Sequence, residues 1–395
     1  MTITELRRIL KNHPKYPGTI DLNRVPLVND GYPGTFNLSM MGAECIEQYG
    51  QNLEYTHHYC FSKIGQMIRF NDWEENFDIA GKYDIENSYR YLGLFHMGDM
   101  GGEKMIKNGH SQMPELTQQT ITSLVYMLVN KLGLDIKNFR ISYHPGGSVK
   151  QITQGKYNFD KYIPVGPSID FWYDLGFKSE NFFVEVSRNT VLALNNFEYH
   201  SPWGYRNEIH YFYNGKMLDI ATVEQLCYRP IFARSGEIIG LTDWDHGSAV
   251  NGVGIERLLM VLNNLDSIHD LEHIQDLSDF ILSQSYNPNV EHAICLNETL
   301  RPIQAILGDI FRYENLSKNR KVKYRHMVKN TVFRAEKLGL SLSQEFLMQY
   351  FNLNADLQPF YPELREDLYG KIGDFLECVG RLDELYPLHS KHPTT

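Results

Sequence analysis

The second part of the chain shows one continuous pattern, in which apolar residues recur every three or four positions. This spacing is typical of amphipathic helices. It predicts helices over residues 271–283, 290–311, 324–338, 343–350 and 363–385. We therefore expect an all-α region at the C-terminal side, with its boundary between residues 265 and 285, and we divide the chain into domains 1–270 and 271–395.

The first part of the chain mixes helical and strand patterns. Thr2 and Glu5 have the spacing of a capping box, so a helix is expected from there to about Asn12. The apolar spacing of residues 116–132 predicts a second helix, which Gly133 ends. A strand is predicted at 35–41, a helix at 43–49 and a strand at 218–222. Residues 55–99 are predicted to contain two strands joined by a loop at 71–82. Residues 150–190 are predicted to form a β-rich meander, to which we assign no chemistry.

Residues 251–257 (Asn-Gly-Val-Gly-Ile-Glu-Arg) open a helix predicted at 255–262, whose apolar face must be buried. Glu256 and Arg257 lie off that face. Gly252 and Gly254 have no Cβ, so a flat ligand is able to approach the backbone closely there. A dinucleotide-binding fingerprint would need a third glycine, which is missing. The pattern alone leaves two interpretations open, a ligand site or a plain strand-to-helix turn with a solvated Glu–Arg pair.

The Gly-x-Gly-x-Glu-Arg sequence at 252–257 resembles motif 3 of the class II aminoacyl-tRNA synthetases, and its flanks are similar to the alanyl-tRNA synthetase branch. The resemblance extends from about residue 2 to residue 385. It implies an α+β catalytic domain with an antiparallel sheet flanked by helices, followed by an all-α tRNA-recognition domain. It also implies that Gly252 and Gly254 form the floor of an ATP site, that Asn251 and Glu256 belong to that site, and that Arg257 contacts the nucleotide.

Residues 55–99 resemble motif 2 of the same family, and Arg69 occupies the position of the motif-2 arginine. Attack of a carboxylate on the α-phosphate of ATP builds up negative charge, and a fixed guanidinium stabilises that charge. The alternative for Arg69 is a surface ion pair with Asp72 or Glu74. Tyr89 is a candidate for stacking on the adenine, with a place in the core as the alternative.

Residues 194–226 resemble the second half of the alanyl-type active site. The resemblance makes Glu208 and Asp219 candidate ligands of Mg²⁺, and Glu208 also a nucleotide-binding residue. Mg²⁺ needs only one or two carboxylates when phosphate oxygens and water complete its coordination. The alternative for both residues is a solvent-facing carboxylate on a strand.

The amino-acid half of the predicted site departs from the family pattern. Thr222 stands where the family has Asn, and Val250 stands where the family has the Asp that binds the substrate's ammonium group. Burying an ammonium group without a carboxylate is costly. Either Asp243 or Asp245 therefore replaces the missing acid, or the substrate is not alanine. Thr222, Val250 and Asp245 are the candidate substrate-binding residues.

Positive charge is concentrated at 318–337 in a chain whose net charge is −10. A basic helix is often only a solvated face. This segment, together with Tyr-Pro-Glu-Leu at 361–364, also resembles the tRNA-recognition helices of the family, whose cations hold acceptor-stem phosphates. The family residues that read the G·U wobble are not kept at 317–319, which is a further departure.

The composition is that of an ordinary globular protein. The five cysteines lack C-x-x-C spacing, which argues against a disulfide framework and a cysteine zinc site and fits a reducing cytoplasm. No apolar run has the length of a membrane span, and no signal-peptide pattern is found at the N-terminus. We expect a cytoplasmic protein without membrane contact and without the family's editing domain.

The resemblance implies an AMP-forming ligase that uses ATP and Mg²⁺ to activate a small amino acid as an acyl-adenylate and transfers it to an acceptor. In the first hypothesis the acceptor is tRNA, which the basic segment 318–337 favours. In the second, a tRNA-independent paralogue loads an amine or a carrier protein. In the third, a catalytically silent paralogue binds or regulates. Thr222 and Val250 favour the second or third hypothesis, whereas Arg69, Glu256 and Arg257 count against the third.

Overall fold

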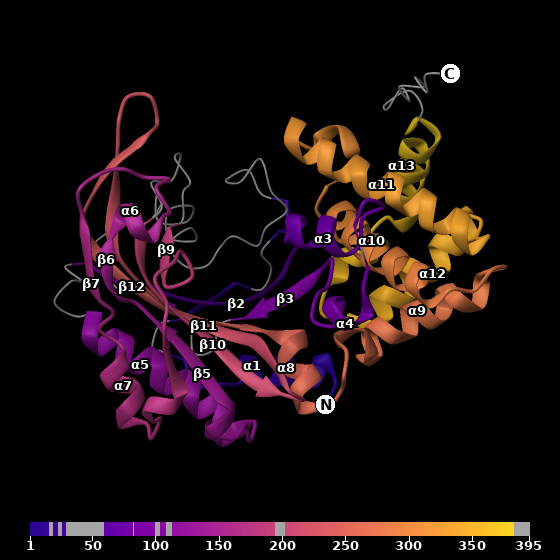
Figure 1. The fold of residues 1–395 in the computed structure, drawn as a ribbon. Coiled ribbons are helices and arrows are strands. Elements are labelled where there is room, and N and C mark those ends of the chain that lie inside the picture. The colour runs from indigo at the N-terminus through magenta and orange to yellow at the C-terminus, as the bar shows by residue number, and fades with distance from the viewer. Residues whose placement is uncertain are drawn as a thin grey trace, which may run out of the picture. The chain divides into compact units, whose positions relative to one another are not determined.

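The computed structural model describes residues 1–15, 19–22, 26–28, 59–81, 83–98, 103–107, 113–193, 202–310 and 312–382. These fall into two compact units (Figure 1). The first comprises Met1–Val25, Leu38–Gln66 and His96–Asn264, and the second comprises Pro26–Asn37, Met67–Phe95 and Leu265–Thr395. The predicted strand at 35–41, the helix at 43–49 and residues 194–201 lie outside the described residues.

A large mixed sheet organises the first unit. Among the described residues, ten strands form it, and most neighbouring pairs are antiparallel. The main path is β1 (Ile20–Leu22), β2 (Tyr59–Met67), β3 (Phe95–Gly98), β12 (Ile238–Gly254), β11 (Lys216–Phe232), β10 (Trp203–Tyr213), β5 (Phe139–Tyr143) and β8 (Phe182–Val184). β4 (Glu103–Lys107) pairs with β12 and β2, and β9 (Val191–Ala193) pairs with β10. β1 runs parallel to β2, and β5 runs parallel to β8.

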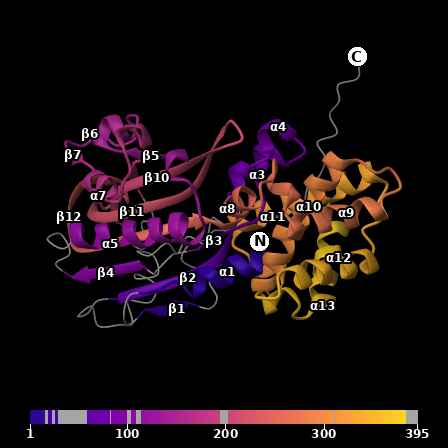
Figure 2. The same cartoon turned by 90° about the horizontal axis from the view of Figure 1, so that it is seen from below.

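Helices flank this sheet. α5 (Met113–Val125) continues as a π-helical segment to Lys131 and packs along β12 and β11 (Figure 2). It ends where Gly133 adopts a φ of 75°, so the predicted helix at 116–132 and its glycine stop are confirmed. α1 (Ile3–Lys11) begins with the predicted capping box of Thr2 and Glu5 and contacts α8 (Ile255–Leu262). The predicted helix 255–262 is confirmed to the residue.

The segment 150–190 differs from the predicted β-rich meander. It contains α6 (Val149–Ile152), α7 (Ile169–Asp174) and a 3-10 turn at Ser179–Asn181, with only β7 (Tyr162–Val165) and β8 as strands. β7 pairs with β6 (Pro145–Ser148) in a separate two-stranded sheet. The prediction was wrong because aromatic residues such as Trp172, which is buried on α7, were taken as strand residues.

The C-terminal region, which belongs to the second unit, is helical, as predicted. Its long helices are α9 (Glu272–Gln284), α10 (Val290–Asp309), α11 (Lys318–Leu338), α12 (Gln344–Leu357) and α13 (Leu368–Gly380). α10 is buried along almost its whole length, which makes it the central helix of this core. The predicted single helix at 363–385 is instead a 3-10 turn at Pro362–Leu364 followed by α13. No helix among the described residues combines the length and the apolar character that a bilayer span requires.

Part of the strand–loop–strand prediction for 55–99 is wrong. The expected loop at 71–82 contains α3 (Phe70–Asn76), and α4 (Ile85–Ser88) follows it before β3 begins. Trp73 and Phe77 of this segment are fully buried in the helical core. Burial of these two aromatic side chains provides the free energy that orders a segment rich in Asn and Asp.

His269 gives this helical core a testable pH dependence. Burial, reinforced by the charge of Arg301, lowers the pKa of His269 from 6.5 to about 3. Glu298 lies 3.9 Å from its Nδ1 atom, and the ring of Tyr83 also faces it. Below pH 6.5, His269 binds a proton in the unfolded chain but stays neutral in the folded chain. The free energy of unfolding should therefore fall by about 1 kcal/mol per pH unit until the pH reaches the folded-state pKa of His269.

The measurement is urea unfolding of the parent and of His269→Phe between pH 7 and pH 4. The difference in unfolding free energy between the two proteins should shift in favour of the variant as the pH falls. His326→Phe is the control, because the His326 side chain is 38% exposed and lies beside Glu74. Parallel pH profiles for the parent and His269→Phe would contradict the assignment.

Candidate functional site

Half of the residues predicted to bind ligands lie on one face of the sheet. Residues opposite each other on neighbouring strands share a face, and successive residues alternate between faces. The register therefore places one polar set on the same side: Arg206, Glu208 and His210 of β10, Asp219, Thr222 and Glu224 of β11, and Val250, Gly252 and Gly254 of β12. We call this set the polar face.

Burial distinguishes the polar face from the opposite one. Along β10, Arg206, Glu208 and His210 are partly exposed, whereas the intervening Asn207 and Ile209 are buried. α5 packs on the buried side, so that side belongs to the core of the unit. On β10 the polar face is thus the side on which a polar ligand finds accessible groups, whereas Thr222, Glu224 and Val250 of the same face are buried.

Arg257 joins the polar face from the first turn of α8. Its Nη1 atom donates to the backbone oxygen of Asp219 at 3.0 Å and to its Oδ2 atom at 3.2 Å. A bulge in β11, at the register shift between Ile209 and His210, brings Asp219 opposite His210. The side chains of Arg257 and Asp219 keep 18% and 33% exposure, so the pair is fixed and still accessible to a ligand.

The backbone at Gly254, between β12 and α8, has space for a Cβ atom. A Cβ built at Gly254 would meet nothing among the described atoms closer than the backbone oxygen of Ile220, at 3.9 Å. Packing inside the unit therefore does not demand glycine at this position. An unfilled space above a glycine beside a fixed guanidinium is the arrangement expected for a group that approaches the backbone closely.

Glu256 differs from the prediction that it binds the nucleotide directly. It is 1% exposed, and it accepts hydrogen bonds from the backbone nitrogen of His96 at 2.9 Å and from His96 Nδ1. His96 is itself fully buried on β3. Glu256 is therefore committed to a contact between β3 and the start of α8, and this contact fixes the position of the adjacent Arg257.

The two predicted Mg²⁺ ligands are both held by arginines. Glu208 Oε1 lies 2.9 Å from Nη2 of Arg206, as Asp219 lies against Arg257. Glu208 and Asp219 are diagonal rather than direct neighbours in the register. Among the described residues, no group of three or more His, Cys, Asp or Glu side chains is arranged to hold a metal. These carboxylates fit a cation only when phosphate oxygens supply most of its ligands.

Several predicted residues lie elsewhere. Asn251 is on the buried side of the sheet, where it donates to the backbone oxygen of Thr120 at 3.3 Å, so a nucleotide on the polar face would not reach it. Asp243 lies opposite Tyr228 in the β11–β12 register, on the far side of the register shift between Leu226 and Tyr228. Its side chain is 62% exposed and lies beside Lys161. It is therefore not a neighbour of Val250, and the suggestion that it replaces the missing acid is not supported. The side chain of Asp245 lies outside the described residues.

Arg69 and Tyr89 belong to the second unit. Arg69 is the exposed N-cap residue of α3 rather than a strand residue, and its guanidinium lies over the ring of Phe95 at 5.4 Å. Tyr89 follows α4 as its C-cap and is 7% exposed, which agrees with the core alternative.

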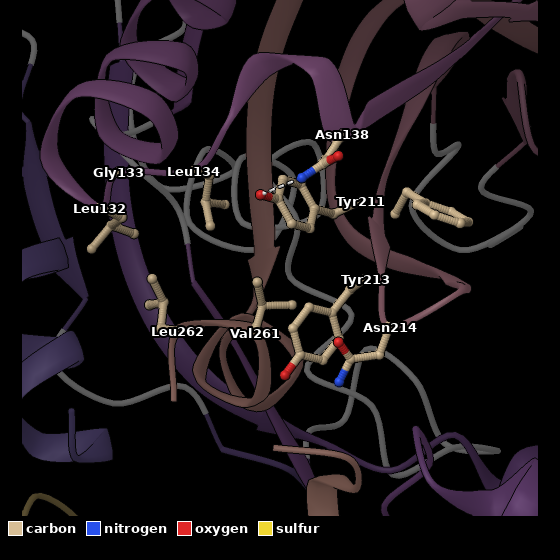
Figure 3. A pocket seen from close by; sticks show the side chains of 10 residues that line it. Leu132, Gly133, Leu134, Asn138, Tyr211, Tyr213, Asn214, Val261 and Leu262 are labelled. Carbon is tan, nitrogen blue, oxygen red and sulfur yellow. Dashed lines mark hydrogen bonds between the residues drawn. The ribbon is translucent and has the colours of Figure 1, made fainter. Parts of the chain in front are cut away.

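A cavity of about 510 Å³ lies near the C-terminal end of α8 (Figure 3). It is lined by Leu132, Gly133, Leu134, Asn138, Tyr211, Phe212, Tyr213, Asn214, Val261 and Leu262. Asn138 Nδ2 donates to the hydroxyl of Tyr211 at 3.3 Å. No charged side chain lines this cavity, so it does not suit a triphosphate.

Three residues of this region, Arg206, Glu224 and His96, were not predicted from the sequence. Arg206 and Glu224 alternate with Glu208 and Thr222 along their strands, and that two-residue spacing was a usable signal once the strands were assigned. His96 and Glu256 are 160 residues apart in the sequence, and no local sequence pattern predicts their contact.

No protein-family model matches this chain, and no curated protein matches it. Among solved structures, the chain is similar to the apo histidyl-tRNA synthetase of S. aureus, at 12% identity over 85% of this chain and 82% of that chain, with a TM-score of 0.34. A TM-score this low does not establish a common fold. The α+β class, with an antiparallel-rich sheet flanked by helices and followed by a helical region, rests on the strand order and helices themselves and agrees with the prediction.

Proposed function

We propose that this chain is an ATP-dependent, AMP-forming ligase that activates a small amino acid as its adenylate and passes the acyl group to an acceptor. The observation that carries the proposal is the Arg257–Asp219 pair beside the open space above Gly254, on the polar face of an antiparallel sheet. The resemblance of 252–257 to motif 3 of the class II aminoacyl-tRNA synthetases supports it.

The reaction proposed requires positioning and charge stabilisation more than a side-chain nucleophile. An oxygen of the substrate carboxylate forms a bond to the α-phosphorus of ATP, and the bond from that phosphorus to the bridging oxygen of the β-phosphate breaks. Pyrophosphate leaves with the electron pair. Negative charge on the phosphate oxygens rises during this step, and the planar guanidinium of Arg257 is suited to stabilise it because Asp219 holds it in place.

The roles of the carboxylates follow from their contacts. Asp219 orients Arg257, and Glu256 fixes the start of α8 through His96. Glu208 and Asp219 are the residues that would hold Mg²⁺ beside the phosphates. The metal ion would neutralise charge on the pyrophosphate leaving group. Arg69 remains a proposed contributor to charge stabilisation.

The decisive experiment is amino-acid-dependent pyrophosphate–ATP exchange over a panel of small amino acids, with and without tRNA. Exchange without tRNA supports adenylate formation. Exchange that occurs only with tRNA would place the acceptor in the activation step. No exchange with any amino acid, while ATP still binds, would overturn the enzyme proposal and favour the regulatory paralogue, for which Val250 in place of an acid is the supporting observation.

We propose tRNA as the first acceptor to test, because α11 carries an accessible basic stripe. Lys318, Lys321, Arg325 and Lys329 follow one another at spacings of three or four residues, so they share a helix face, and all four are at least partly exposed. Arg334 is not available to a partner, because it is buried and donates to the backbone oxygens of residues 77 and 78. A carrier protein or a small amine is the alternative acceptor. The compartment that we propose for the protein is the cytoplasm.

Reversing two charges of this stripe should weaken tRNA binding. The double variant Lys318→Glu/Lys329→Glu is expected to lower the affinity for total tRNA by on the order of tenfold, and to make the dependence of log K on log salt shallower by about 1 to 2 units. Lys150→Glu/Lys156→Glu, at exposed positions of the first unit, is the matched control. Equal affinities and salt slopes for the two double variants would favour the carrier-protein or amine acceptor.

A further inference from the structure

Among the described residues, the lining of the cavity at the C-terminal end of α8 shares no member with the polar face. Tyr211 and Tyr213 line the cavity from β10, where they alternate with His210, so their side chains point to the side of the sheet opposite the polar face. The chain that follows α5 and the last turn of α8 supply most of the remaining lining. The cavity is therefore a second candidate site, which the role proposed for Arg257 does not explain.

The lining of this cavity has an apolar side and a hydrogen-bonding side. In Figure 3 the three leucines of the lining lie on the left, whereas the two tyrosines, with Asn138 and Asn214, lie on the right. No charged side chain among the described residues belongs to the lining. A ligand that matches both sides has an apolar body and a few uncharged polar groups.

The hydroxyl of Tyr211 provides a defined donor on the hydrogen-bonding side. It accepts from the backbone nitrogen of Asp135 at 3.2 Å and from Nδ2 of Asn138 at 3.3 Å. A phenolic hydroxyl has two lone pairs and one proton, so these two contacts use both lone pairs. The Tyr211 side chain is 6% exposed, and its ring packs edge-on against Phe139 with the ring centroids 5.1 Å apart. The hydroxyl is thus held in place, with its proton directed to an acceptor other than the two groups that it already contacts.

The backbone beside the cavity is irregular. Tyr126–Lys131, at the end of α5, is π-helical, and π-helical turns are rare and occur frequently at functional sites. Gly133, which follows this segment and lines the cavity, has a φ of 75°, and a Cβ built on it would meet no described atom within 4 Å. The chain after α5 therefore leaves this space open instead of filling it.

We infer that this cavity binds a small uncharged molecule that has an apolar ring and a carbonyl or ring-nitrogen acceptor. The ring packs against the leucine side, and the acceptor takes the proton of the Tyr211 hydroxyl. An ionic ligand would lose its hydration here without a charged partner. The volume of about 510 Å³ lies within the range of roughly 300 to 1,000 Å³ that is usual for small-molecule sites. This inference does not depend on the proposed function.

The test titrates the full chain, with labelled leucine and valine methyl groups, with benzamide and with benzoate. The two probes have the same size, but only benzamide is uncharged. Benzamide should shift the methyl signals of the cavity with a dissociation constant in the millimolar range, and benzoate should bind at least about tenfold more weakly. The methyl signals that should shift are those of Leu132, Leu134, Val261 and Leu262.

Two variants test the details of the site. Tyr211→Phe removes the donor and should weaken benzamide binding by about three- to tenfold. Tyr173→Phe is the matched control, because Tyr173 is 44% exposed on α7 and does not line the cavity, and it should bind like the parent. Leu262→Trp places an indole in the space and should abolish the shifts at the other cavity methyl groups. Thermal melting shows that each variant is folded.

Three results would overturn the inference. The first is the absence of cavity methyl shifts with benzamide, or shifts of equal size at Leu347, which is fully buried in the helical core. The second is equal binding of benzamide and benzoate, which would contradict an uncharged ligand. The third is unchanged benzamide affinity in folded Leu262→Trp. Unchanged affinity in folded Tyr211→Phe would remove the Tyr211 hydroxyl from the site.

Discussion

Replacing Arg257 by alanine is expected to lower kcat/KM for pyrophosphate–ATP exchange by about two to three orders of magnitude. That is the typical effect of removing one donor from a preorganised site that stabilises developing charge. Asp219 holds the Arg257 guanidinium through two contacts of 3.0 and 3.2 Å, so the guanidinium does not have to reorganise when charge appears on the phosphate. The loss should fall mainly on kcat, since the interaction strengthens in the transition state.

Three further variants make the Arg257 result specific. Arg257→Lys keeps the charge but loses the forked donors, so its activity should lie between those of the parent and the alanine variant. Asp219→Asn should also reduce kcat, because it removes the carboxylate that contacts Arg257 and that is proposed to hold Mg²⁺, although the backbone oxygen of Asp219 still accepts from Arg257. Arg234→Ala, at the exposed turn between β11 and β12, removes an arginine from the same unit and should have no effect. An Arg257→Ala protein with activity within threefold of the parent would remove Arg257 from the reaction.

Helices and their ends were predicted correctly from the sequence where a single local pattern determined them. The apolar spacing of α8 marked its ends, and the capping box marked the start of α1. In α3, the turn-forming residues were given more weight than Phe70, Trp73 and Phe77, whose three- and four-residue spacing predicts a buried helical face. That error was avoidable, because the aromatic spacing was visible in the sequence.

The assignment of residues to the two faces of the sheet required the structure. Asn251 and Gly252 are adjacent in the sequence, yet one lies on the buried side and the other on the polar face. Glu256 and Arg257 were expected to meet the ligand together, but Glu256 turns inward to His96. Strand register and long-range partners determine these outcomes, and neither is encoded in the spacing of a short motif.

The buried pair of Glu298 and Arg301 should dominate the stability of the helical unit. Both side chains are fully buried, and Arg301 Nη1 lies 2.9 and 3.1 Å from the two oxygens of Glu298. The pair also anchors the turn before β3, because Gly93 N donates to Glu298 at 2.6 Å and Arg301 Nη2 donates to the backbone oxygen of Leu94 at 3.0 Å. Arg301→Ala leaves a buried carboxylate without its partner, which should cost about 3 to 5 kcal/mol.

Calorimetric melting measures this loss, with Arg365→Ala as the control. Arg365 and Asp356 form an ion pair that is mostly exposed, so it should contribute less than about 1 kcal/mol.

Replacing both partners by apolar residues, as in Glu298→Leu/Arg301→Met, often restores stability for an isolated buried pair. Here it should not, because the nitrogen of Gly93 and the oxygen of Leu94 would lose their partners. Amide hydrogen exchange at Gly93 should accelerate in the double variant. Full recovery of the melting temperature in that variant would show that the pair contributes only its own charges, and that the turn before β3 is held by other contacts.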